Sequence, residues 1–252
     1  EVATIGAMLD RPDVRLVTLT GTGGVGKTRL AVRVAEEWSA AFTDGVAFGP
    51  LADVRDPDRL AAVVSETLGD FGRMAKDPGE MVQDYLADRV FLLVLDNFEH
   101  LLSAAPLLAQ WLSRCPWLTI LVTSRFRLRI SGEHEFAVRP LPLPPEETTR
   151  SIGQLTGAPS IQLFIERSQA ARADFALNSV NSDAVVALCT RLEGLPLAIE
   201  LAAARMSHMG PGGLLERLMS GLPVLVDGPH DQPDRLRSLE RAIAWSFDLL
   251  TN

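Results

Sequence analysis

The sequence predicts an α/β domain built on a parallel β-sheet, followed by a smaller domain made only of helices. Three observations lead to this prediction. Short apolar runs alternate with segments of helical spacing over residues 1–145. Proline then recurs through residues 140–145, and proline has no backbone N–H to give to a helix or a sheet. Beyond that run, apolar residues recur only at helical spacing.

The apolar runs of the first part predict five strands. The run 90–95 is apolar at every position, which is typical of a strand in a parallel sheet that is covered on both faces. Helices between such strands give right-handed βαβ units. The expected strands are 15–20, 46–48, 90–95, 118–123 and 135–138, and the expected helices are 30–38, 60–68, 79–87 and 101–112.

The second part predicts helices separated by glycine and proline. Gly194 is a natural helix end, and Pro196 is a natural first-turn residue of the helix that follows. A stretch rich in Gly, Pro and Asp, residues 227–233, separates a last helical segment. The expected organisation is therefore a first domain over 1–145, a helical domain over 146–226, and a linker with the start of a further domain over 227–252.

Composition restricts the kinds of partner. The formal net charge of −8 disfavours direct nucleic-acid binding by this part of the protein. Two cysteines give no disulfide framework or Cys-rich metal site, so a reducing cytoplasm is the simpler expectation. No apolar run is long enough to cross a bilayer, and we expect no membrane partner.

Residues 21–28 read Gly-Thr-Gly-Gly-Val-Gly-Lys-Thr and fit the pattern G-x-x-x-x-G-K-[ST] between a strand and a helix. Glycines let backbone N–H groups converge on phosphate oxygens, and the following helix adds its partial positive charge. We expect Lys27 to reach the β- and γ-phosphates and the Thr28 hydroxyl to bind Mg²⁺. The residues expected around the phosphates are Gly23, Gly24, Val25, Gly26, Lys27, Thr28 and Arg29.

Asp96 follows the third apolar run, at the strand end where ligands of parallel sheets bind. It is the expected second Mg²⁺ ligand, with a helix-capping Asp as the alternative. Many ATPases place a second acid next, but here that residue is Asn97, which cannot usefully accept a proton. Glu99 is the nearest carboxylate that could replace it, and an acid of a helix first turn is an equal alternative.

Arg125 ends the fourth strand, after Thr123 and Ser124. An arginine there can bind the γ-phosphate and distinguish ATP from ADP. The alternative is a solvated arginine of a basic loop, since Arg127 and Arg129 follow. The sequence Asn-Lys-x-Asp, which reads guanine, does not occur, so adenine is the expected base. The four histidines show no metal-ligand spacing.

These motifs occur in the same order as in a known family. After the glycine-rich loop come Leu-Val-Leu-Asp-Asn, then Thr-Ser-Arg, then Gly-Leu-Pro-Leu-Ala at residues 194–198. The chain resembles the NB-ARC type of STAND signalling ATPases. It is similar in particular to the module of large bacterial transcription regulators of the LuxR and SARP kinds, which often carry the run seen at residues 197–205.

The resemblance implies a five-stranded parallel sheet of order 5-1-4-3-2, a small helical domain, and a winged helix that would begin near residues 236–252. It implies ATP or ADP with Mg²⁺ as ligand, with Pro196 near the adenine and with Val2 and Ile5 touching the base. Asn97 departs from the acidic residue of the family, so slow hydrolysis is expected.

The function expected from these features is a nucleotide-driven switch in which hydrolysis acts as a timer. DNA-binding or other effector domains outside this chain would give the output, and nucleotide-dependent self-association is a further expectation. Two alternatives are a binding-only scaffold, which Asn97 favours, and a small-molecule kinase, which would need an acceptor pocket and an Arg-rich lid.

Overall fold

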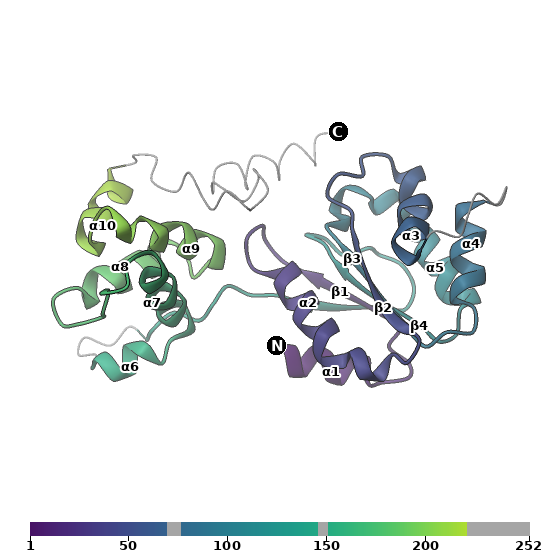
Figure 1. Cartoon of the computed structure of the whole chain (residues 1–252), viewed down its shortest axis with the longest axis horizontal. Helices are drawn as coiled ribbons and strands as arrows, with labels where there is room; N and C mark the ends of the chain where they lie inside the picture. The colour runs from purple at the N-terminus through teal and green to yellow at the C-terminus, as the bar shows by residue number, and fades with distance from the viewer. Residues whose placement is uncertain (70–76, 146–150, 221–252) are drawn as a thin grey trace. The chain divides into compact units, whose positions relative to one another are not determined.

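The computed structural model describes residues 1–69, 77–145 and 151–220, and these form two compact units (Figure 1). The first unit comprises residues 1–22 and 27–138, and the second begins at Arg139 and also includes Gly23–Gly26. The segment 227–252, where we expected a linker and the start of a winged helix, lies outside the described residues.

A five-stranded sheet forms the centre of the first unit. Its order is β2-β3-β4-β1-β5, which is the predicted 5-1-4-3-2 read from the other edge, and the prediction is confirmed. All four neighbouring pairs are parallel. The strands are β1 (Leu16–Thr20), β2 (Gly45–Pro50), β3 (Phe91–Asp96), β4 (Leu118–Thr123) and β5 (Glu133–Ala137).

The apolar runs correspond to the middle of the sheet. Strands β1, β3 and β4 are buried at every position, whereas the edge strands β2 and β5 are mostly half-buried or exposed. Phe91, Leu93 and Leu95 join one core with the helices that follow β2 and β3, so the residues between them face the opposite side. Helices of this unit are α1 (Val2–Leu9), α2 (Lys27–Trp38), α3 (Leu60–Leu68), α4 (Pro78–Leu86) and α5 (Ala105–Arg114).

Several predicted elements begin one to four residues from the expected position, and two of these differences have a physical reason. The helix expected over 101–112 begins at Ala105, because two short 3-10 turns, Phe98–His100 and Leu102–Ala104, come first and Pro106 then lies in the first helical turn. Strand β5 begins at Glu133, two residues before the predicted start. β5 is an edge strand and begins with polar residues, so no apolar run marks where it starts.

The second unit is helical throughout its described part. Ile161 and Phe164 of α7 pack with Val185 and Leu188 of α8 and with Ile199 of α9 in one apolar core. Burial in this core raises the pKa of the Cys189 thiol to about 12, so it stays protonated at neutral pH. The helices are α6 (Ile152–Thr156), α7 (Pro159–Ala171), α8 (Ser182–Arg191), α9 (Pro196–Ala204) and α10 (Pro211–Met219).

The proline-rich run is hydrogen-bonded to these helices. The Leu141 N–H donates to the Gly194 carbonyl oxygen at 2.9 Å, and the Ser160 hydroxyl donates to the Pro142 carbonyl oxygen at 2.9 Å. Just upstream, the Val138 N–H donates to the Thr20 carbonyl oxygen at 2.8 Å, within the first unit. The chain is thus attached to the sheet up to Val138 and to the helices from Leu141 onward.

None of the helices in the described part of the chain has both the length and the apolar character that a membrane crossing needs.

Candidate nucleotide-binding site

The glycine-rich loop connects β1 to α2 and lies at the carboxyl edge of the sheet (Figure 1). Gly24 and Gly26 have φ values of +78° and +101°, which L side chains rarely adopt. Such glycines turn successive N–H groups toward one point, and α2 begins directly after the loop at Lys27. The loop therefore has the backbone that an anion-binding site requires.

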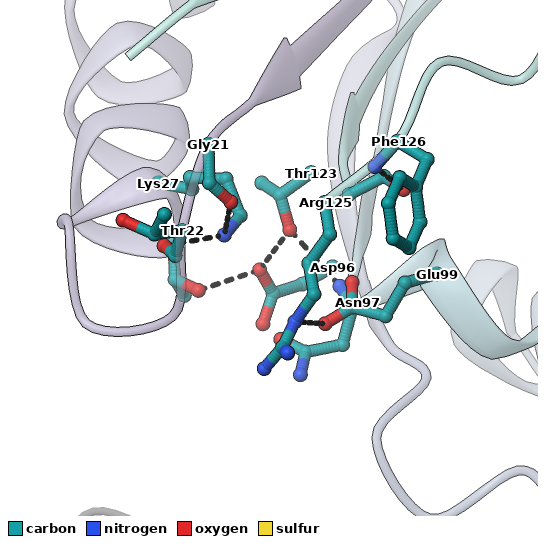
Figure 2. Close-up of polar contacts among 11 residues, drawn as sticks. Gly21, Thr22, Lys27, Asp96, Asn97, Glu99, Thr123, Arg125 and Phe126 are labelled. Atoms are coloured by element: carbon teal, nitrogen blue, oxygen red, sulfur yellow. Dashed lines mark hydrogen bonds and ion pairs between the residues drawn. The ribbon is translucent and has the colours of Figure 1, made fainter. Parts of the chain in front are cut away.

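Lys27 lies across this loop. Its Nζ donates to the carbonyl oxygens of Gly21 at 2.8 Å and Thr22 at 3.1 Å (Figure 2). Burial lowers the pKa of Lys27, and three neighbouring charges also act on that pKa: Glu99 raises it, Arg125 lowers it and Asp96 raises it. The ammonium group thus belongs to one electrostatic cluster with these three side chains.

Asp96 connects three elements at the strand ends. Its Oδ1 accepts hydrogen bonds from the hydroxyl groups of Thr28 and Thr123, both at 2.6 Å. Thr123 Oγ1 accepts in turn from the backbone N–H of Asn97 at 2.9 Å. The carboxylate of β3, the first turn of α2 and the end of β4 are therefore fixed to one another.

Thr28 and Asp96 supply a hydroxyl and a carboxylate oxygen side by side, which are ligand types that Mg²⁺ prefers. No group of three or more His, Cys, Asp or Glu side chains suited to a metal occurs in the described ranges. A Mg²⁺ ion at Thr28 and Asp96 would thus take its other ligands from phosphate and water, as this cation usually does.

Glu99 and Arg125 form a second polar pair beside Asp96 (Figure 2). Arg125 Nε donates to Glu99 Oε1 at 3.1 Å, and the two side chains are 15% and 4% exposed. Glu99 lies in the 3-10 turn Phe98–His100, which is preceded by Asn97 in the left-handed region (φ 66°, ψ 52°). Asparagine tolerates that backbone better than most residues, which gives Asn97 a structural reason for its position.

Comparisons with known proteins identify relatives of this chain and solved structures that share its fold. No protein-family model matches the chain. It is 36% identical over 242 residues to a protein of Mycobacterium tuberculosis named as a candidate HTH-type transcriptional regulator, covering 94% of this chain and 25% of that protein. It is 31% identical over 243 residues to the regulatory protein AfsR of Streptomyces coelicolor, covering 92% and 21% of the two chains.

Two solved structures share the fold. One is a signal transduction ATPase with numerous domains (STAND) of Pyrococcus horikoshii, with a TM-score of 0.53 and 14% identity over 87% of this chain and 32% of that chain. The other is a Walker-type ATPase of Pyrococcus abyssi, with a TM-score of 0.54 and 13% identity over 87% of this chain and 70% of that chain.

This chain is homologous to a region of these bacterial regulators, and its fold is that of STAND and Walker-type P-loop ATPases. The resemblance inferred from the motifs is thereby confirmed for the bacterial regulators as relatives and for the fold. The chain spans a quarter or less of the length of the two regulators compared here, which extend well beyond the matched region.

Through the contacts described above, the structure brings together the following predicted site residues, along with the glycines of the loop: Lys27, Thr28, Asp96, Asn97, Glu99 and Arg125. It does not join Val2 and Ile5 to them. Both lie on α1, where Gly6 packs against Trp38, the last residue of α2, at the end opposite Lys27. Ile5 is fully buried. The predicted contact of Val2 and Ile5 with the base, like that of Pro196, stays a prediction.

Thr123 is the residue of this site that sequence reasoning missed. Its hydroxyl holds Asp96 and the N–H of Asn97 at once. A signal existed, because Thr123 is the polar residue that ends the apolar run of β4. Its partners could not be inferred without knowing that β3 and β4 are neighbours in the sheet.

Proposed function

We propose that this domain binds ATP or ADP with Mg²⁺ and acts as a nucleotide-driven switch in a bacterial transcription regulator, with slow hydrolysis as the timer. The observation that supports this most is the 2.6 Å hydrogen bond between Thr28 and Asp96, beside the loop that Lys27 spans. These are the two Mg²⁺ ligands that the motifs predict.

The proposed roles follow from the chemistry of each group. The loop N–H groups of Gly23–Gly26 and the amino end of α2, with Arg29, bind the β-phosphate, and the Lys27 ammonium exchanges its two carbonyl partners for phosphate oxygens. Mg²⁺, when bound to Thr28 and Asp96, supplies positive charge that offsets the charge of the phosphates. Arg125 reaches the γ-phosphate and so distinguishes ATP from ADP.

The wider role is proposed from the relatives. A cytoplasmic regulator of the LuxR or SARP kind would carry DNA-binding or effector domains outside the matched region, and its nucleotide would control their output or self-association. This is supported by similarity to an HTH-type regulator and to AfsR. One observation favours a binding-only scaffold instead: Asn97, after Asp96, cannot act as a base.

The proposal is tested by calorimetric titration with ADP and Mg²⁺. Lys27→Ala removes the charge aimed at the phosphates, so the affinity should fall by roughly tenfold or more, the loss of one charge-assisted contact. Arg33→Ala is the matched control, because it removes an exposed positive charge from the same helix α2. It should change the affinity by less than about twofold, which is typical of a surface ion pair.

The same titration tests the metal site. Asp96→Ala should remove the increase in ATP affinity that Mg²⁺ produces, while binding without Mg²⁺ persists. An unchanged ADP affinity in Lys27→Ala, with the fold intact by circular dichroism, would contradict the assignment of the glycine-rich loop as the phosphate site.

A further inference from the structure

Glu99 has an unusual environment for a glutamate. Its side chain is 4% exposed, and its Oε1 accepts one hydrogen bond from Arg125 at 3.1 Å. Its Oε2 is buried and has no hydrogen-bond partner among the described residues. A buried carboxylate oxygen without a donor is costly, so its retention calls for an explanation beyond local structure.

The turn that carries Glu99 is held firmly. Phe98 is fully buried in the core, and His100 Nε2 donates toward the carbonyl oxygens of Leu51 at 3.0 Å and Val54 at 2.6 Å. Both neighbours of Glu99 are thus anchored, and the Glu99 carboxylate is held in place rather than free to turn to solvent. Such fixed positions are what a catalytic group requires.

Glu99 also belongs electrostatically to the phosphate site. Of the charges that act on the Lys27 ammonium, Glu99 has a larger effect than Arg125 or Asp96. Figure 2 shows the Arg125 guanidinium group directed at the Glu99 carboxylate. A phosphate held by Lys27 would therefore lie within the field of Glu99 and Arg125 together.

Neither Asp96 nor Asn97 is suited to act as the base that accepts the proton of the water. Asp96 is held by two hydroxyl donors on Oδ1 and is the proposed metal ligand. Asn97, which occupies the position of the usual second acid, has no proton-accepting carboxylate. Glu99 is the remaining carboxylate of this cluster.

We propose that Glu99 orients and deprotonates the water that attacks the γ-phosphate, and that Arg125 holds Glu99 until a γ-phosphate takes over the guanidinium group. This rests on the proposed nucleotide-binding function. The water oxygen forms a bond to the γ-phosphorus as the bond from that phosphorus to the β,γ-bridging oxygen breaks. The electron pair stays on that oxygen of ADP, and the water proton passes to Glu99 and then to the released phosphate.

The exchange of partners makes hydrolysis depend on the γ-phosphate. While Arg125 donates to Oε1, the guanidinium group occupies a carboxylate oxygen of Glu99 that could otherwise accept a hydrogen bond from the water. A γ-phosphate competes for the same guanidinium group, because arginine binds phosphate and carboxylate oxygens by the same planar donors. Binding of ATP thus releases the carboxylate that its own hydrolysis requires, whereas ADP does not.

The first experiment measures single-turnover ATP hydrolysis together with ADP affinity. Glu99→Gln keeps the shape of the side chain but removes its charge and with it the base, so the rate should fall by roughly 100-fold or more with ADP affinity nearly unchanged. Glu66→Gln, an exposed glutamate on α3, is the matched control and should keep the rate. Glu99→Asp, which retains a carboxylate, should recover part of the rate and covers the case in which Glu99→Gln does not fold.

Each result of this experiment has a definite meaning. Wild-type hydrolysis in Glu99→Gln, or absence of hydrolysis in a wild-type protein that binds ATP, overturns the role of Glu99 and leaves nucleotide binding intact. Failure of the wild-type protein to bind ATP or ADP overturns the proposed function itself. The two failures are therefore distinguished by the binding measurement alone.

The second experiment tests the exchange of Arg125 by affinity rather than by activity. With the Glu99 charge removed, Arg125 is released, so Glu99→Gln should bind a non-hydrolysable ATP analogue roughly three- to tenfold more tightly, with ADP unchanged. This gain should be clearly smaller in an Arg125→Ala background. An equal gain in both backgrounds, or weaker binding of both nucleotides, overturns the exchange.

Discussion

Gly26 and Gly194 both lie in turns and both have positive φ, but the surroundings of the two glycines differ. Gly26 in the phosphate loop has φ +101°, and no described atom outside its chain neighbours lies within 4 Å of where a Cβ would be. Gly194, between α8 and α9, has φ +67°, and a Cβ there would overlap the carbonyl oxygen of Leu141.

The difference separates two uses of glycine. At Gly26 only the backbone conformation excludes other residues, and the space beside the loop stays open, as a ligand site requires. At Gly194 close packing against the proline-rich run excludes a side chain as well, and the Leu141 N–H donates to the Gly194 carbonyl oxygen there. The first glycine serves binding, and the second attaches the chain segment from Leu141 onward to the helices.

Gly194→Ala should have the largest effect on stability. A left-handed backbone costs an L residue about 1–2 kcal/mol, and overlap with a backbone carbonyl that cannot move aside adds about 1–3 kcal/mol. We expect the opening free energy of α8 and α9, measured by native-state hydrogen exchange, to fall by about 3 kcal/mol.

Gly213→Ala, on α10 with open surroundings, is the control and should be neutral or stabilising by up to about 1 kcal/mol. Protection in Gly194→Ala equal to that of the control would show that Leu141 is not held against this turn.

Gly26→Ala should lose less stability but should lose binding. Its strain alone costs about 1–3 kcal/mol, while the altered loop can no longer direct its N–H groups at a phosphate, so ADP affinity should fall at least about tenfold. Gly132 is a matched control, because it also has positive φ (+80°) and open surroundings. Gly132→Ala should show a similar loss in a denaturant titration with unchanged ADP affinity. If both variants weaken ADP equally, the effect of Gly26 is one of stability, and the comparison of the two turns fails.

The sequence predicted the fold where a local pattern determines it. The run of Phe91 to Leu95 is apolar because both faces of β3 are covered, and the loop before Lys27 can be recognised because all its glycines lie within residues 21–26 of one short segment. The predicted start of strand β5 came two residues too late, because an edge strand needs no apolar alternation. The side chain of its first residue, Glu133, instead accepts hydrogen bonds from the N–H groups of Leu128 and Arg129.

Contacts between distant residues were not predictable in this way. Glu99 and Arg125 are 26 positions apart, and their ion pair depends on β3 and β4 being adjacent. Thr123 was passed over for the same reason. The hydrogen bond from Leu141 to Gly194 joins a segment that the sequence predicts to be a linker to a turn more than 50 residues later. Nothing in either sequence pattern indicates that the two segments are in contact. The sequence pattern therefore indicated which residues are suited to bind a nucleotide, whereas the contacts between those residues could be identified only from the fold.

Pro196→Ala gives the smallest expected effect and extends the comparison to the residue after the second turn. Pro196 begins α9, where its fixed φ restricts the unfolded chain more than alanine does, so the substitution should cost about 0.4–1 kcal/mol of opening free energy in α9.

The family resemblance adds a prediction that stability alone does not make: if Pro196 contacts the adenine, ADP affinity should also fall a few-fold. Calorimetry with ADP and with inorganic pyrophosphate, which lacks the base, distinguishes the two causes. Weakened ADP binding with unchanged pyrophosphate binding supports a contact with the base. If ADP and pyrophosphate are both bound as in the wild-type protein, Pro196 only begins a helix, and the Gly-Leu-Pro turn has a structural role alone.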